Sequence, residues 1–289
     1  MSGIAQEEAL DRARLQPGRE VARFWRATAY DDLECLSARF VRHRYAPHTH
    51  DTYAIGVIVA GAEGFVCRGE RQTAGTGQFA VVEPGELHDG YPVGGGYAYR
   101  MFYPSVALMT ETLADAAEGA PVAPPHFASN VIDDADLAGR FVRLHDALDC
   151  GVGRLGRDQA LVTTLARLVR RHARGTVRPG APGHDPGRVQ RVVHFLEDRL
   201  ADDPGLSDLA AFAGCSRFHL IRCFSRATGL TPHAWLVDRR VRAAKRHLAA
   251  GLRPAEVAAR CGFADQAHLT RAFKARVGVT PAVYCRAHG

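Results

Sequence analysis

The hydrophobic pattern divides the chain into a front half of short strands and a back half of helices. Between Val21 and Tyr103, apolar runs such as YAIGVIVA and QFAVVEP alternate with glycine-rich turns. Many short strands separated by turns are typical of a small antiparallel barrel or jelly roll. We therefore predict a β-barrel domain in this region, preceded by a charged N-terminal arm over residues 1–20.

Helical periodicity begins in the middle of the chain. Apolar residues recur at helix spacing within 133–149 and again within 158–175. These two helices either cover the barrel or pair with a second subunit. A Gly- and Pro-rich stretch then predicts a linker. The predicted divisions are an arm (1–20), a sensor domain (21–120), a helical segment (121–175), a flexible linker (176–187) and an all-helical domain (188–289).

One phrase occurs twice in the helical domain, as HLIRCFSRATGLTP at 219–232 and HLTRAFKARVGVTP at 268–281. On a helical wheel each copy has an apolar side, led by Leu220 and Leu269, which predicts a core face. The opposite side predicts a face that enters a groove. Its residues are Phe218, Ile221, Arg222 and Ser225 in the first copy, and Ala267, Thr270, Arg271 and Lys274 in the second, with Gln266 at the edge.

Each copy follows a short alanine-rich helix and a tight turn, which is the pattern of a helix-turn-helix. In the first copy we expect Ser207 and Ser216 to cap the two helices and Gly214 to make the turn. The corresponding residues of the second copy are Pro254, Gly262 and Asp265. The chain therefore contains two helix-turn-helix units.

Charge is distributed unevenly between the halves. The chain carries +6 overall, but residues from 186 onward hold 17 basic and 8 acidic side chains, whereas the front is slightly acidic. A basic domain favours a polyanionic partner. The helix predicted between the two units, 232–251, is about 28 Å long, close to the ~34 Å turn of B-DNA. It could hold both units against successive major grooves.

Residues 187–286 resemble the DNA-binding domain of the AraC/XylS family of bacterial transcription regulators, through LSDLAAFAGCSRFHLIRCFSRATGLTPHAWL and RPAEVAARCGFADQAHLTRAFKARVGVTPAVY. The resemblance implies base or groove contacts at Phe218, Arg222, Gln266, Ala267 and Arg271. Two of these, Arg222 and Arg271, suit a bidentate contact to guanine. We assign phosphate contacts to Arg217, Arg226, Lys274, Arg239 and Arg240.

The front half contains a histidine pattern, His48 and His50 in YAPHTHDTYAIG and His88 in EPGELHDG. It resembles cupin metal motifs, but Tyr53, Ala54 and Ile55 stand where a glutamate ligand is expected. A metal site, a small-molecule pocket and purely structural histidines all remain open. We expect no cofactor metal, and His48, His50 and His88 are the candidates if one binds.

A barrel mouth is a common ligand site. The residues that we predict to line it suit a small polar or zwitterionic ligand; they are Arg44, His48, His50, Tyr53, Glu86, His88, Tyr99 and Arg100.

These observations predict an α+β multidomain protein with an N-terminal cupin-like β-barrel (jelly roll) and an all-α double helix-turn-helix domain. We expect a ligand-responsive, sequence-specific DNA-binding regulator and not an enzyme. A metal-dependent cupin enzyme fused to a DNA-binding domain, and an architectural DNA-binding protein of low specificity, are the alternatives. Expected partners are double-stranded DNA, RNA polymerase, a small-molecule effector and a second copy of the chain. We expect no membrane partner and a cytoplasmic, nucleoid-associated location. Scattered cysteines fit a reduced compartment.

Overall fold

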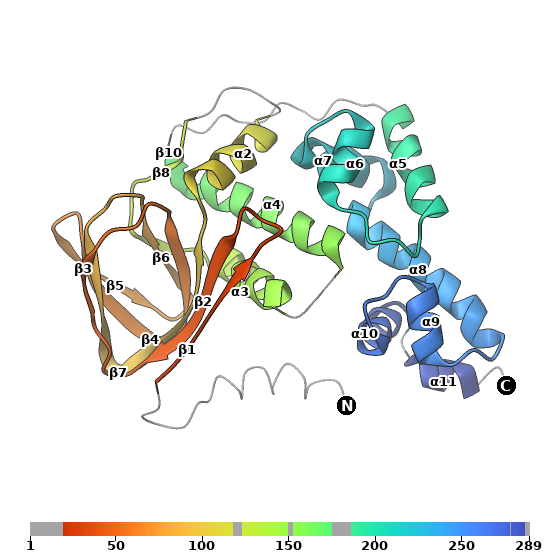
Figure 1. Ribbon diagram of the computed structural model, residues 1–289, viewed down its shortest axis with the longest axis horizontal. Coiled ribbons are helices and arrows are strands. Elements are labelled where there is room, and N and C mark those ends of the chain that lie inside the picture. The colour runs from red at the N-terminus through yellow and green to blue at the C-terminus, as the bar shows by residue number, and fades with distance from the viewer. Residues whose placement is uncertain (1–19, 118–122, 150–152, 175–185, 278, 287–289) are drawn as a thin grey trace. The chain divides into compact units, whose positions relative to one another are not determined.

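A computed structural model describes residues 20–117, 123–149, 153–174, 186–277 and 279–286 (Figure 1). The chain forms two compact units. Unit 1 contains the chain up to Met109 together with His126–His145 and His172–Arg174, and unit 2 contains Thr110–Pro125, Asp146–Arg171 and the chain from Gly175. The predicted arm and linker lie almost entirely outside the described residues.

Unit 1 is built on one antiparallel sheet, with eight strands in the part of the chain that the structure describes. Along the sheet the order is β1-β2-β7-β4-β6-β9, while β3 pairs with β7 and β5 pairs with β4. The strands are β1 (Val21–Ala27), β2 (Leu33–Phe40), β3 (Tyr45–His48), β4 (Ala54–Cys67), β5 (Glu70–Gly75), β6 (Gln78–Val82), β7 (His88–Tyr103) and β9 (Val131–Asp133). The prediction that Val21–Tyr103 is strand-rich is confirmed.

The long central strands β4 and β7 bend, which lets the sheet fold back around an interior. Their register shifts between Ile58 and Ala60 and again between Gly61 and Ala62. At this bend a Cβ on Gly61 would lie 2.0 Å from the Gly96 carbonyl oxygen, and both glycines have positive φ. Only glycine permits such a close approach of two strands. The enclosed core includes Phe40, Phe65, Tyr97, Tyr99 and Met101.

The opposite face of the sheet is covered by α3 (Ala135–Asp149). Its Phe141 ring packs on Phe79 of β6 and Phe102 of β7, with ring centroids 5.4 and 4.7 Å apart. These residues alternate with interior ones, as the period of two in a strand requires. A helix was predicted over 133–149 and is confirmed. The short strands β8 (His126–Phe127) and β10 (Ala173–Arg174) pair with each other beside this sheet.

Unit 2 is helical. Its helices are α4 (Arg154–His172), α5 (Pro186–Asp198), α6 (Leu206–Ala213), α7 (Arg217–Thr228), α8 (Pro232–Ala249), α9 (Pro254–Arg260), α10 (Gln266–Val277) and α11 (Pro281–Arg286). The end of α2 (Val106–Ala116), a helix that the sequence analysis did not predict, also belongs to unit 2. The predicted boundaries placed α3 and α4 in one segment, 121–175, whereas α3 packs mainly in unit 1 and α4 in unit 2.

Helix α8 connects the two predicted helix-turn-helix units. Trp235 and Leu236, near its start, belong to the core around α5, α6 and α7, while Val241 and Leu248 belong to the core around α9, α10 and α11. One continuous helix therefore supports both units, as the sequence predicted.

The predicted helix ends are largely confirmed. The Ser216 hydroxyl accepts the His219 amide, and Gly214 adopts a left-handed φ of 64°. In the second copy the Asp265 carboxylate accepts the His268 amide at 2.6 Å. The prediction for Ser207 is wrong, because α6 begins at Leu206 with Gly205 as its N-cap. In the described part of the chain, no helix is both long and apolar enough to cross a bilayer.

Candidate functional site

Helix α10 presents the polar face that the second sequence repeat predicted. Leu269, Ala272 and Phe273 are buried in the core, while Gln266, Ala267 and Arg271 are exposed. Thr270 and Lys274 are half-buried beside them, and the Thr270 hydroxyl donates to the Gln266 carbonyl at 2.8 Å. The exposed guanidinium of Arg271 has the reach and donor geometry to contact a base edge.

Helix α7 is arranged differently from the prediction. Leu220, Cys223 and Phe224 are buried as expected, but Phe218 and Ile221 are also buried, each only 7% exposed. They belong to one hydrophobic cluster together with Ala116 of α2 and residues of α4. In this structure Phe218 and Ile221 therefore do not project into solvent, and their contact with DNA stays a prediction.

The N-terminus of α7 is held by polar contacts to the end of α2, both within unit 2. The Ser216 hydroxyl donates to the Asp115 carbonyl at 2.9 Å, and the Arg217 guanidinium forms an ion pair with the Asp115 carboxylate. Arg222 is half-buried, with its guanidinium 5.7 Å from the Phe218 ring centroid. A phosphate contact by Arg217 would have to replace its pairing with Asp115.

The assignment of Arg240 to a phosphate is wrong. Its side chain is in the interior of unit 2, with the residue 3% exposed, and it donates to the Leu200 carbonyl at 2.7 Å and to the Asp202 carbonyl. Burial lowers the pKa of Arg240 from its usual range. This arginine ties α8 to the loop after α5. Arg239 lies over the Trp235 ring at 4.7 Å, and Arg226 is exposed.

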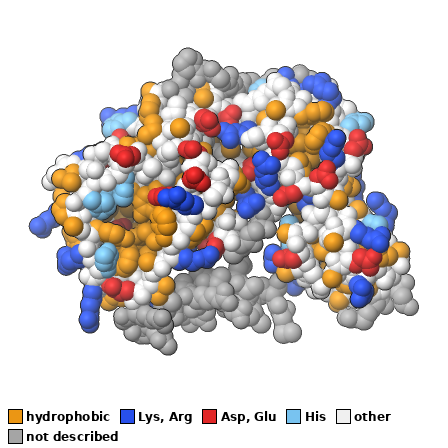
Figure 2. All heavy atoms as spheres, in the orientation of Figure 1, with side chains coloured by type: hydrophobic (Ala, Val, Ile, Leu, Met, Phe, Trp, Pro, Cys, Tyr) orange, Lys and Arg blue, Asp and Glu red, His pale blue; other side chains and the backbone are white. Residues whose placement is uncertain are grey.

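Unit 1 contains a cavity of about 80 Å³ in the interior that the folded sheet encloses. Figure 2 shows hydrophobic side chains gathered on the face of unit 1, with histidine side chains next to them. Four of the predicted ligand residues line the cavity, namely His48, His50, His88 and Tyr99. They come from β3, the segment after it, and β7, which the sheet brings together.

The three histidines form a compact cluster. Their ring centroids lie 4.3 to 5.0 Å apart, and one ring nitrogen from each lies within 4.8 Å of the others. His48 and His88 each direct Nδ1 at a backbone carbonyl, of Ala46 and Glu86, which places the proton there and leaves Nε2 with a lone pair. Burial, with the neighbouring imidazoles, lowers the pKa of His50 to about 4.

Such imidazoles are suitable ligands for a divalent transition metal. No carboxylate belongs to this cluster in the described residues, so the donor set differs from the three-histidine, one-glutamate set of the cupin motif. The expectation that no metal is bound stays a prediction, and we assign no step of the function to a metal.

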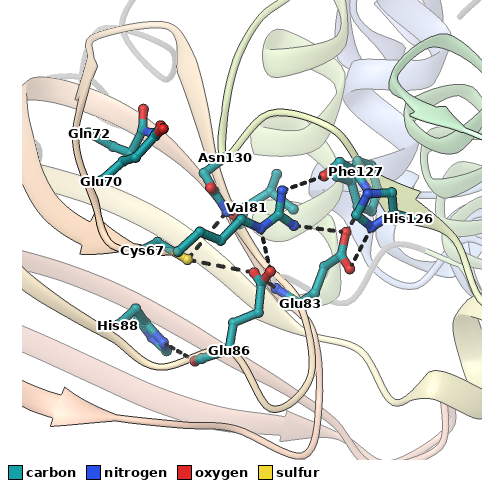
Figure 3. A network of polar contacts seen from close by, with 11 residues as sticks. Cys67, Glu70, Gln72, Val81, Glu83, Glu86, His88, His126, Phe127 and Asn130 are labelled. Atoms are coloured by element: carbon teal, nitrogen blue, oxygen red, sulfur yellow. Dashed lines mark hydrogen bonds and ion pairs between the residues drawn. The ribbon is translucent and has the colours of Figure 1, made fainter.

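Glu86, predicted as a ligand residue, belongs instead to a polar network beside the cavity (Figure 3). Its carboxylate pairs with Arg68 and accepts the Glu83 amide at 2.9 Å. Arg68 also donates to the Phe127 carbonyl at 3.0 Å, and Glu83 pairs with His126 at 3.0 Å. The network fixes β8 to the turn before β7, which is a structural role.

Three other predicted ligand residues do not line the cavity. Arg44 is exposed, with its guanidinium 5.3 Å from the Tyr91 ring centroid. Tyr53 is buried and packs edge-on against Phe127. Arg100 follows Tyr99 in β7, so its side chain lies on the opposite face of the sheet.

Polar lining residues that were not predicted from the sequence include Tyr45, Glu63, Asp89 and Tyr103. Glu63 is the most unusual, because it is an acidic residue only 9% exposed. Glu63 lies two residues before Phe65 and four before Cys67 in β4, so all three side chains are on the same side of the strand. This period of two was a signal that could have placed the Glu63 side chain inside the barrel.

Comparison with known proteins agrees with this arrangement. A family model described as an AraC-like ligand binding domain matches residues 32–166, and one described as a helix-turn-helix domain matches residues 209–287. The regulator YbfI of Bacillus subtilis is 27% identical over 238 residues, covering 82% of this chain and 86% of YbfI. The transcriptional activator NphR of Rhodococcus is 41% identical over 106 residues, covering 36% of this chain and 30% of NphR.

Among solved structures, the DNA-binding domain of the global transcriptional factor AdpA, in complex with a target DNA, is 34% identical. The match covers 35% of this chain and 92% of that domain, with a TM-score of 0.34. The two family models together cover both units in the order that the sequence predicted, and the expected fold class is confirmed. The chain belongs to the AraC family of transcriptional regulators.

Proposed function

We propose that this regulator recognises specific DNA sites through α7 and α10 together, and that a small molecule in the cavity of unit 1 controls this recognition. The observation that carries the proposal is the single helix α8, which bears one helix-turn-helix unit at each end. Its 18 residues span about 27 Å at 1.5 Å per residue. This length suits two recognition helices in successive major grooves.

Base recognition falls mainly to the arginines of the two helices. Arg271 is exposed on α10, and Arg222 occupies the equivalent place on α7. Each can donate two hydrogen bonds to guanine O6 and N7, a contact worth about 1–3 kcal/mol of discrimination. Ala267 offers only a methyl group, which suits a thymine methyl and no hydrogen bond.

Control by a ligand requires a connection between the cavity and α7. Strand β7 contributes Tyr99 and Tyr103 to the cavity, and α2 begins three residues later at Val106. The far end of α2 carries Asp115, which pairs with Arg217 of α7. A ligand that shifts β7 could thus change whether Asp115 of α2 stays paired with Arg217 of α7. The coupling is reciprocal, so specific DNA would tighten ligand binding by the same factor.

We further propose that RNA polymerase and a second copy of this chain are partners, and that the protein acts at the nucleoid. A homodimer would place four recognition helices on DNA, which lengthens the site and raises its specificity. The direction of control, activation or repression, follows from where the site lies relative to a promoter.

A genome-wide binding footprint tests the proposal. We expect discrete sites that share a sequence, and weaker preference at one base step of that sequence in Arg271→Ala but not in Arg140→Ala, an exposed arginine of α3 paired with Asp136. Uniform coverage without a preferred sequence would contradict specific recognition and support the architectural alternative.

A further inference from the structure

The cavity of unit 1 contains a buried carboxyl group. Glu63 projects inward from β4 and is 9% exposed. Its Oε1 lies so close to β7 that a Cβ on Gly90 would be 3.1 Å away, with the Tyr45 ring at 3.2 Å from the same point. The carboxyl group is therefore confined in the cavity and not directed at solvent.

Glu63 has no positive partner among the residues that the structure describes. No lysine or arginine lines the cavity. Burial raises the pKa of the Glu63 carboxyl group, and the Tyr97 hydroxyl lowers it. A buried carboxylate without a counter-charge is costly, and proteins rarely keep one unless something pairs with it. This points to a partner that comes from outside the chain.

Besides the three histidines and several apolar side chains, the lining contains tyrosine rings and a second acidic group. The hydroxyl oxygens of Tyr45 and Tyr99 lie 3.0 Å apart, and the Tyr97 and Tyr99 rings stack with centroids 5.3 Å apart. Tyrosine ring faces attract cations and also pack against hydrocarbon. Asp89, whose carboxylate accepts the Val66 amide at 2.6 Å, adds a second acidic group to the lining.

We propose that the cavity binds a small organic cation, a primary amine with a hydrocarbon body. Its ammonium group pairs with Glu63, and its hydrocarbon part packs on the rings of Tyr45, Tyr99 and Tyr103. The inference rests on the proposed function, in which unit 1 binds the effector. An anionic or zwitterionic effector fits less well, because its negative group would enter a cavity that holds two carboxyl groups and neither Arg44 nor Arg100.

Amine binding in this cavity depends on pH in a defined direction. Burial raises the pKa of Glu63 to about 7, and an ammonium group favours the ionised carboxylate. The affinity for amines should therefore increase as pH rises from 6 to 8. The other titratable groups that face the cavity are Tyr45, His48, His50, His88, Asp89, Tyr99 and Tyr103. A Glu63→Gln variant separates the contribution of Glu63 from theirs.

Calorimetric titration of the full chain tests the proposal with a panel of small primary amines of two to five carbons, linear and branched. Each amine is compared with the alcohol of the same skeleton. We expect at least one amine to bind tenfold or more tightly than its alcohol. In Glu63→Gln that preference should disappear while binding of the alcohol persists. The control is Glu70→Gln, which changes an exposed glutamate of β5 in the same sheet and should keep the preference.

Two results would overturn the proposal: no amine binds more tightly than its alcohol, or Glu63→Gln keeps the preference. Binding that requires added Zn²⁺ would also overturn it, since the imidazole cluster would then hold the ligand. The DNA footprint is independent of this titration. Specific DNA binding without amine binding would reject the ligand class alone, whereas loss of specific DNA binding would reject the proposed function.

Discussion

Replacing Glu63 with glutamine should stabilise unit 1, and the gain should depend on pH. In the native protein Glu63 is a buried acid without a counter-charge, so ionising it costs folding free energy. Glutamine has nearly the same shape and never ionises. A residue that a fold retains at a cost in stability is typical of a functional site.

The magnitude follows from the pKa of Glu63. Burial raises that pKa to about 7 from the usual 4.5. Between these two pH values the folded state binds more protons than the unfolded state, so the free energy of unfolding falls as pH rises. The loss begins near pH 4.5, is complete above pH 7, and amounts to about 3 kcal/mol at 1.36 kcal/mol per pH unit. Glu63→Gln should be more stable than the native protein by about this amount at pH 8, and by under about 1 kcal/mol at pH 5.

Urea denaturation at pH 5 and pH 8 measures this difference. The chain has two tryptophans, Trp25 in unit 1 and Trp235 in unit 2, so a Trp235→Phe background makes fluorescence report on unit 1. Glu70→Gln, on the exposed side of β5, should show no such pH-dependent gain. Equal stability of Glu63→Gln and the native protein at pH 8 would refute the reasoning, since the carboxyl group would then have a partner or access to water.

Three further predictions concern unit 2. Asp115→Ala should raise affinity for a specific site about tenfold or more in fluorescence anisotropy, because it removes a charge-assisted bond worth about 1.5–3 kcal/mol that holds Arg217 on α2. Unchanged affinity, or an equal gain in the control Asp136→Ala, would contradict this. Arg271→Ala should lose about 1–3 kcal/mol of preference at one base step, and an equal loss on all sequences would mean a phosphate contact. Arg240→Met should lower the free energy of unfolding of unit 2 by about 3 kcal/mol in urea, because two carbonyls lose their donor. An undiminished stability would place Arg240 on the surface.

The sequence predicted those parts of the fold in which local pattern and tertiary structure agree. The strand-rich region ends at Tyr103 because Pro104 and the periodicity after it do not continue the sheet. The two repeats predicted their helices because capping residues such as Ser216 and Asp265 act on amides only three positions away. Such local signals do not depend on the rest of the chain.

The misses have a common cause, which is packing between segments distant in sequence. A helical wheel places Phe218 and Ile221 on the outer side of α7. It takes no account of α2 and α4, whose apolar residues lie in the same hydrophobic cluster as these two side chains. It likewise treats Arg240 as exposed, although carbonyls forty residues earlier bind it. Within the barrel, Glu86 pairs with Arg68 across a turn. No one-dimensional pattern contains these contacts.

The central claim is that α7 and α10, both packed on α8, bind successive major grooves. Selection of bound duplexes from a random DNA library tests this claim most directly. We predict two short conserved elements about 10 base pairs apart for each chain, with Arg271→Ala weakening conservation at one base step of only one element. A single conserved element, or two whose spacing varies freely, would show that α7 and α10 do not bind as a rigid pair and would contradict the account.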